Sequence, residues 1–320
     1  LSFTLIFCIA CSGLNTENDL EKANKNLVSQ TTDIPPQLKI MTSTPILADW
    51  VNQITDNQPA AKSIIPYGID PHSYNPGAKD IASIAKSDLV FTIGLNYEPQ
   101  PLSKFLANHP EIKQVHLINY ISPIHFNSKD THKHEHDENE PDNYDPHFWF
   151  DPTRVIFAID TIAEELSILN PSDTNRYQTR ASEYTVELEN LDTYIRESIS
   201  KIPKDQRNFM TVHESLGYLT NRYDLNVVHA VIPNLDSTIG INPQNLVNAT
   251  KLIQENDIQV IFLENDTSNK SAKTVANETG IKVVTGLNVE TLSNKSQTYI
   301  DFMKNNTQII VENLQKYVRR

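Results

Sequence analysis

The sequence predicts an α/β protein with two Rossmann-like lobes, mainly parallel sheets and one long linking helix. Strand-like and helix-like segments alternate before residue 120 and again after residue 208, an order typical of parallel sheets covered by helices. An unbroken helical pattern over residues 173–200 separates the two parts. The length of 320 residues exceeds that of most single domains and favours two.

The first lobe is predicted over residues 38–170. Short apolar runs bounded by Pro, Gly or Asp predict its strands, and proline in the first turn supports two of its helices. The expected strands are 38–44, 61–66, 88–94 and 114–120, and the expected helices are 45–55, 78–86 and 151–169.

The linking helix is predicted over residues 171–202 and the second lobe over residues 203–320. Apolar residues recur every three or four positions along the helix, namely Tyr177, Ala181, Tyr184, Leu188, Leu191, Ile195 and Ile199. Nothing else in the chain offers a matching coiled-coil partner, so we expect a strut between lobes. The second lobe is expected to contain strands 208–212, 225–232, 258–264 and 281–287, and helices 214–223, 242–256, 271–280 and 296–318.

The N-terminal residues indicate export. The apolar run in residues 1–13 is typical of part of a signal peptide and too short to span a bilayer. Ala10-Cys11-Ser12-Gly13 resembles a lipobox with Cys11 lipidated, although Cys8 stands where Leu is usual; an ordinary cleaved signal is the alternative. Residues 14–37 are predicted to be a flexible tether. We expect a periplasmic or cell-surface protein.

Charge and cysteine content limit the function. A formal net charge of -13 argues against binding to nucleic acid or anionic membranes, which requires clustered Lys and Arg. Membrane contact is therefore expected only through a lipid anchor. Both cysteines lie in residues 1–13, so any metal site in the folded part must use histidine or oxygen ligands.

Four candidate metal ligands stand at strand or helix boundaries. His72, His213 and Glu290 follow predicted strands, and His147 precedes the helix that starts at Asp151. Ligands in open α/β sheets bind beyond the carboxyl ends of the strands. Three imidazoles and one carboxylate suit Zn2+, with Mn2+ also tolerated.

Two of these histidines stand in the same tripeptide, Asp-Pro-His. It occurs at residues 70–72 and 145–147, and its proline stiffens the loop that carries the imidazole. Asp70 and Asp145 are predicted to orient the rings. The alternative is a pair of ordinary turns with exposed histidines.

Four motifs together resemble the zinc/manganese solute-binding lipoproteins of bacterial ABC metal importers. They are "GIDPHSYNP", "DPHFWFDP", "FMTVHESLGYLTNRYDL" and "IKVVTGLNVETL". The resemblance implies that His72, His147, His213 and Glu290 bind the metal, and that a monomer delivers it to a permease with its ATPase. The family usually has Asp where Glu290 stands, so Glu264 or water is an alternative fourth ligand.

The segment 125–143 contains His125, His132, His134 and His136 among charged residues. It is too charged to fold alone, and we expect only weak metal binding by these histidines. The family's zinc-specific members often carry such a loop, so it favours zinc. A solvated acidic loop is the alternative.

Three other functions compete with zinc uptake. A manganese or iron importer component would use the same scaffold, although an imidazole at position 213 favours zinc. A zinc hydrolase is disfavoured because the HExxH pattern is absent and a fourth protein ligand leaves no open position for water, so we expect no enzyme. A cell-adhesion protein on this fold stays an alternative.

Overall fold

The computed structural model describes residues 38–126, 144–211, 214–229, 243–264 and 270–315. Contacts divide the chain into residues 1–37 and 38–320, and every described element belongs to the second unit. The predicted signal segment and tether lie outside the described residues. The lobe boundaries stay a prediction, because residues 38–320 form one compact unit.

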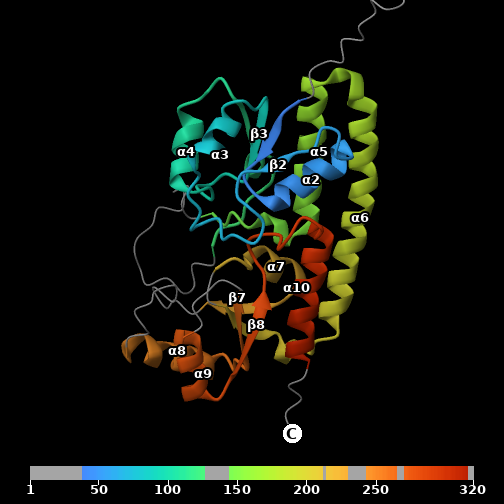
Figure 1. The fold of residues 1–320 in the computed structure, drawn as a ribbon. Coiled ribbons are helices and arrows are strands. Elements are labelled where there is room, and N and C mark those ends of the chain that lie inside the picture. Colours follow the sequence, from blue (N-terminus) through green and yellow to red (C-terminus); the bar gives the residue numbers. More distant parts are fainter. Residues whose placement is uncertain (1–37, 127–143, 212–213, 230–242, 265–269, 316–320) are drawn as a thin grey trace, which may run out of the picture. The chain divides into compact units, whose positions relative to one another are not determined.

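The first sheet has four parallel strands in the order β2-β1-β3-β4. They are β1 (Ile40–Thr42), β2 (Lys62–Ser63), β3 (Leu89–Thr92) and β4 (Lys113–His116). Its connecting helices are α2 (Pro45–Thr55), α3 (Ala78–Ile84) and α4 (Gln100–Ala107) (Figure 1). The side chain of Thr44 caps α2 by accepting the backbone N–H of Leu47 at 3.3 Å, a common way to begin a helix.

The second sheet has the same strand order, β6-β5-β7-β8, and is also parallel. Its strands are β5 (Asn208–Thr211), β6 (Asn226–His229), β7 (Val260–Glu264) and β8 (Lys282–Leu287). The helices of this part are α7 (Gly217–Tyr223), α8 (Pro243–Glu255), α9 (Lys270–Thr279) and α10 (Tyr299–Leu314). The two sheets are therefore topological copies of each other, as the predicted fold class requires.

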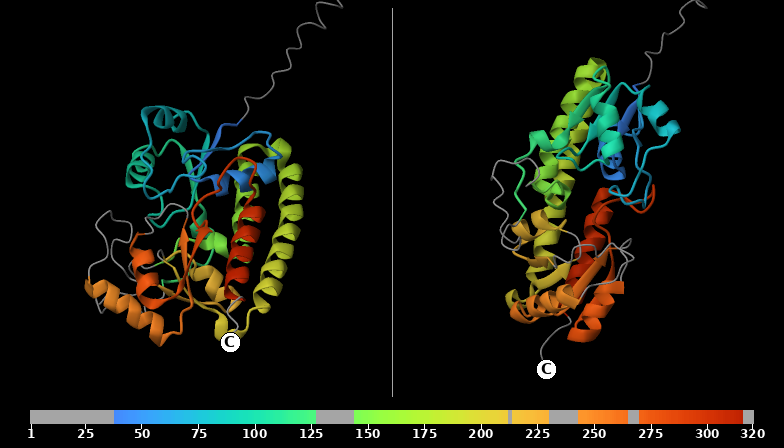
Figure 2. Two further views of the ribbon diagram at one scale, coloured as in Figure 1. Left: turned by 60° about the horizontal axis from the view of Figure 1, so that its bottom comes forward. Right: turned by 90° about the vertical axis from the view of Figure 1, so that its left-hand side faces the viewer.

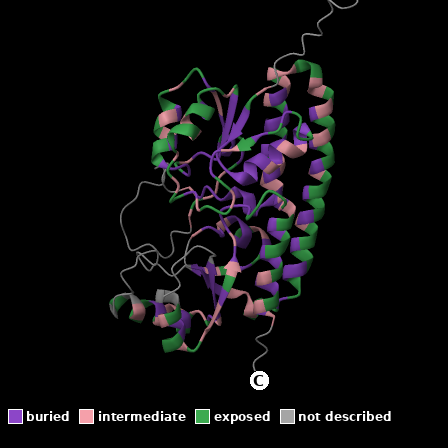
Figure 3. Cartoon of the chain, viewed as in Figure 1, coloured by how far each residue is buried: buried purple, intermediate pink, exposed green. Residues whose placement is uncertain are grey.

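Two long helices, α5 (Pro152–Leu169) and α6 (Thr174–Ser200), lie side by side next to the first sheet, and α6 continues beyond α5 alongside α10 of the second part (Figures 1 and 2). Asp151 caps α5 by accepting the backbone N–H of Thr153 at 3.0 Å. The apolar stripe predicted on α6 is buried, from Tyr177 to Ile199. It packs against α2 and α5 from the first part and α10 from the second, so α6 supports both lobes (Figure 3).

The predicted elements are present, but several are shorter. The strand expected over 114–120 ends at His116, and residues 117–120 form a 3-10 helix. The helix α4 was not predicted, and two prolines, Pro99 and Pro101, stand at its start. In the structure these prolines occupy the N-cap and the first turn of α4, where a missing N–H has no cost.

One apolar cluster extends across the elements of both sheets. Trp50, Phe148, Trp149, Phe150 and Tyr299 are all nearly or completely buried in it, so the run 148–150 is part of the core. No helix among the described residues has the length and apolar character that a membrane crossing needs.

Candidate metal centre

Two imidazoles and one carboxylate converge at the carboxyl ends of the strands. One nitrogen of His72, one of His147 and one carboxylate oxygen of Glu290 lie within 4.8 Å of one another. Glu290 Oε1 is 3.2 Å from His147 Nε2 and 3.8 Å from His72 Nε2. The three residues follow β2, precede α5 and follow β8, so the two parallel sheets contribute to one group.

His147 is fixed by Asp145, two residues before it. Asp145 Oδ1 accepts the backbone N–H of His147 at 2.8 Å and lies 2.7 Å from its Nδ1. Both side chains are almost completely buried. A carboxylate on Nδ1 sets the tautomer and directs Nε2 outward, in this case toward Glu290.

His72 has a similar local turn in more open surroundings. Asp70 Oδ1 accepts the backbone N–H of His72 at 2.8 Å, and Pro71 is buried. The His72 side chain is nevertheless 42% exposed, so this ring forms the solvent-facing side of the group.

The loop that carries Glu290 forms hydrogen bonds with residues of the first lobe. Tyr97 donates its hydroxyl hydrogen to Glu290 Oε2 at 2.8 Å. The Trp149 indole N–H donates to the Val289 carbonyl at 3.0 Å, and the Gly68 N–H donates to the Leu292 carbonyl at 2.9 Å. Glu290 is buried, so its position depends on this contact between lobes.

The nearby carboxylates and burial shift the pKa values of the side chains in the site. Burial works to lower the pKa of His147, but the negative charges of Glu290 and Asp145 outweigh it and raise the pKa to about 10. The hydrogen bond with Glu290 raises the pKa of His72 against the effect of burial. Burial, together with Glu290, raises the pKa of Tyr97 well above its ordinary value, which keeps this hydroxyl a donor.

The donor set fits a divalent transition metal. Imidazole and carboxylate are the ligands that Zn2+ and Mn2+ share. Among the residues the structure describes, no other such cluster of three or more His, Cys, Asp or Glu side chains occurs. Tyr97 was not predicted, although it follows β3 at the same sheet edge, because a residue that supports a ligand without binding the metal itself leaves no ligand pattern in the sequence.

The other candidates are only partly described. His213 and three loop histidines (His132, His134 and His136) lie outside the described residues, as does the side chain of Glu264, whose backbone ends β7. His125 is described: its ring stacks on Tyr144 with centroids 4.1 Å apart, and it is not part of the three-residue group.

Comparisons with known proteins match most of the chain. A family model described as "Zinc-uptake complex component A periplasmic" matches residues 40–313. A "Metal ABC transporter substrate-binding lipoprotein" of Lactococcus lactis is 26% identical over 323 residues, covering 98% of this chain and 95% of that protein. "Manganese-binding lipoprotein MntA" of Halalkalibacterium halodurans is 25% identical over 280 residues, covering 87% and 88%.

A solved structure shares the fold. The periplasmic zinc binding protein TroA from Treponema pallidum superposes with a TM-score of 0.74 at 22% identity. The match covers 88% of this chain and 100% of that one. This chain, with its two parallel sheets and one long helix, therefore shares the fold of that protein.

Proposed function

The chain belongs to the family of periplasmic zinc-uptake components, whose model covers most of it, and from this premise we propose that it binds a divalent transition-metal ion for an ABC importer. It is a solute-binding protein and not an enzyme. The observation that carries the proposal is the convergence of His72, His147 and Glu290 from both lobes. The metal is the cargo, and these three residues are its proposed ligands.

We propose Zn2+ as the physiological cargo. His72 and His147 supply nitrogen ligands, which Zn2+ binds well, and His213 is the proposed third imidazole. The description of the family also names zinc. Mn2+ is the alternative: a relative at 25% identity is named for manganese, and the carboxylate of Glu290 suits this harder ion.

The proposed partners follow from the family. A substrate-binding component delivers its metal to a membrane permease that an ATPase drives. We propose an extracytoplasmic location with Cys11 as a lipid anchor, since the first relatives are named lipoproteins.

The test is metal analysis of the purified chain, followed by competition titrations of the metal-stripped protein with Zn2+ and Mn2+. We expect one tight equivalent, with Zn2+ preferred. His109→Ala is a matched control, because His109 pairs with Glu111 at 2.7 Å and lies outside the three-residue group. Tight binding that survives His147→Ala would overturn the assignment, and stronger binding of Mn2+ would favour the alternative.

The histidine segment is proposed to add weak sites only. Deleting residues 127–139 removes most of its imidazoles and none of the three converging side chains. We expect the deletion to remove low-affinity equivalents and leave one tight equivalent in the same titration. If tight binding disappears, the main site lies in that segment.

A further inference from the structure

The helix α7, which belongs to the second lobe, contacts Asp145, the residue whose carboxylate fixes His147. Tyr218 donates its hydroxyl hydrogen to the backbone carbonyl of Asp145 at 2.9 Å. The same hydroxyl accepts the backbone N–H of Ile124 at 3.2 Å. The backbone N–H of Asp145 also donates to the carbonyl of Ile124 at 2.8 Å. Tyr218 therefore holds two neighbouring stretches of the first lobe.

Gly217, the residue before Tyr218, lies directly against the Asp145 side chain. A Cβ atom at Gly217 would stand 2.5 Å from Asp145 Oδ2 and 3.6 Å from Ile124 Cδ1. The first distance is far below van der Waals contact. The backbone of Gly217 is helical, a conformation that suits other residues better than glycine. The close approach to Asp145, not the backbone angle, is therefore what requires glycine here.

The Asp145 carboxylate has little freedom to move away from such a Cβ. Asp145 is 1% exposed, and its other oxygen, Oδ1, accepts the backbone N–H of His147 and lies 2.7 Å from its ring nitrogen. A carboxylate is planar and rigid, so a displacement of Oδ2 also displaces Oδ1. The imidazole of His147 must then turn or lose its partner.

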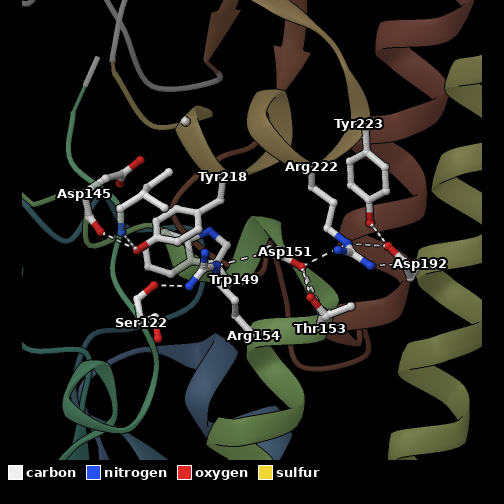
Figure 4. Close-up of polar contacts among 12 residues, drawn as sticks. Ser122, Asp145, Trp149, Asp151, Thr153, Arg154, Asp192, Tyr218, Arg222 and Tyr223 are labelled. Atoms are coloured by element: carbon white, nitrogen blue, oxygen red, sulfur yellow. Dashed lines mark hydrogen bonds and ion pairs between the residues drawn. The ribbon is translucent and has the colours of Figure 1, made fainter. Parts of the chain in front are cut away.

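The position of α7 is itself fixed by a row of charged contacts (Figure 4). Arg222 of α7 contacts Asp192 of α6 through Nε at 2.7 Å and Nη2 at 2.9 Å. Its Nε also lies 3.2 Å from Asp151 at the start of α5. The guanidinium of Arg154 lies over the Tyr218 ring, 5.2 Å from the centroid. These contacts hold α7 in place, with Gly217 and Tyr218 next to Asp145.

We propose that Gly217 and Tyr218 are positioning residues of the metal site, which act on His147 through Asp145. The second lobe then contributes more than its carboxylate: it also sets the direction of a histidine that the first lobe supplies. This inference rests on the proposed function, because it assigns the two residues a role in binding the same divalent metal ion.

The test compares Gly217→Ala with Gly77→Ala in the full-length chain. Both add one methyl group at the start of a helix, but a Cβ at Gly77 meets its nearest neighbour at an ordinary 3.6 Å. We expect Gly217→Ala to weaken Zn2+ binding about 10- to 100-fold, the range seen when a metal ligand loses its supporting partner. The visible absorption of bound Co2+ should change as well, because it reports ligand geometry. Gly77→Ala should match the parent in both measurements.

A double substitution separates positioning from general damage. In an Asp145→Ala background the obstructed carboxylate is gone, so Gly217→Ala should add little further loss of Zn2+ affinity. Tyr218→Phe, which removes one hydroxyl and keeps the ring, should weaken binding about threefold to tenfold and shift the Co2+ spectrum. This variant decides the matter if Gly217→Ala does not fold.

The outcomes that overturn the inference are distinct from those that overturn the function. If the parent and Gly77→Ala bind no metal, the proposed function is wrong. If the parent binds while Gly217→Ala and Tyr218→Phe keep its affinity and Co2+ spectrum, the function stands and the positioning role is wrong. The positioning role is also wrong if the losses of Zn2+ affinity caused by Gly217→Ala and Asp145→Ala add up fully in the double variant.

Discussion

The same tripeptide, Asp-Pro-His, forms two regions of the site that share a local turn and differ in their surroundings. In both, the aspartate Oδ1 accepts the histidine backbone N–H at 2.8 Å. The side chain of His147 is 3% exposed, whereas that of His72 is 42% exposed. The sequence thus determines the turn, and the surrounding packing determines how firmly the ring is held.

The reason lies in the residues that cover each tripeptide. The His147 ring lies against the ring of Trp149, with centroids 5.1 Å apart, and its aspartate lies against Gly217 of α7. The more exposed ring of His72 makes an edge contact with Tyr97, with centroids 5.4 Å apart. We therefore expect His147 and Glu290 to form the preorganised part of the site and His72 to complete it.

Replacing each histidine by alanine should give the largest effects. A ligand in a four-ligand zinc site contributes about 3 kcal/mol of the binding free energy, or roughly 100-fold in affinity. We expect this loss for His72→Ala. His147→Ala should lose about 1,000-fold or more, because it also leaves Asp145 and Glu290 buried without their imidazole. Equal losses in a Zn2+ competition titration would show that the two rings are held alike.

The next largest effect is expected from pH, because protons compete with the metal for the histidine nitrogens. With its pKa raised to about 10, His147 carries a proton in the metal-free protein at neutral pH, and the metal must displace it. Affinity should therefore rise about tenfold per pH unit from pH 6 to 8, or roughly 100-fold in all. An ordinary imidazole pKa would instead give a plateau above pH 7.

The variants identify the proton that is displaced. The raised pKa of His72 adds to the pH dependence. His72→Ala should keep a slope of about one proton per metal above pH 7, and His147→Ala should lose it. A slope that survives His147→Ala would contradict the assignment of this proton.

Neutralising the two aspartates tests the supporting contacts. Asp145→Asn removes the charge beside His147 Nδ1 and should weaken Zn2+ binding about 10- to 100-fold. Asp70→Asn should change it less than about threefold, because an amide oxygen can still accept the His72 backbone N–H. Isothermal titration of both variants with Zn2+ checks the difference, and a larger loss for Asp70→Asn would reverse our ranking.

Tyr97→Phe should have a smaller effect than Asp145→Asn. The Tyr97 ring lies near both histidines, with centroids 5.4 Å from His72 and 6.0 Å from His147, and phenylalanine keeps these contacts. The lost hydroxyl bond to Glu290 should cost about threefold to tenfold in affinity. Stopped-flow transfer of Zn2+ to a chelator measures the matching increase in release rate; an unchanged rate would mean that Tyr97 does not restrain Glu290.

Some of this site could be predicted because parallel strands place their carboxyl ends at one edge. His72 and Glu290 follow strands, and the structure brings both close to His147. Helix α2 was predicted over its full length, Pro45–Thr55, from its proline and apolar spacing. The long helix was predicted from its apolar spacing alone, because this periodicity is a local property of the sequence.

The rest depends on contacts between distant parts of the chain. Tyr97 and Glu290 are 193 residues apart, and no local pattern pairs them. Gly217 reads as an ordinary helix glycine until its neighbour Asp145 is known. The contacts that hold the loop of Glu290 also come from distant residues, because Tyr97, Trp149 and Gly68 all form hydrogen bonds to it.

The contact between Trp149 and His147 gives the chain a built-in optical probe. The protein has two tryptophans, and the ring centroid of one of them, Trp149, lies 5.1 Å from that of His147, whose raised pKa favours the imidazolium form without metal. An imidazolium quenches indole emission by accepting an electron from the excited ring. Zn2+, with its closed d shell, should displace that proton and brighten Trp149, whereas paramagnetic Mn2+ should brighten it less. A fluorimeter can then follow loading and unloading of the site in real time, without a label.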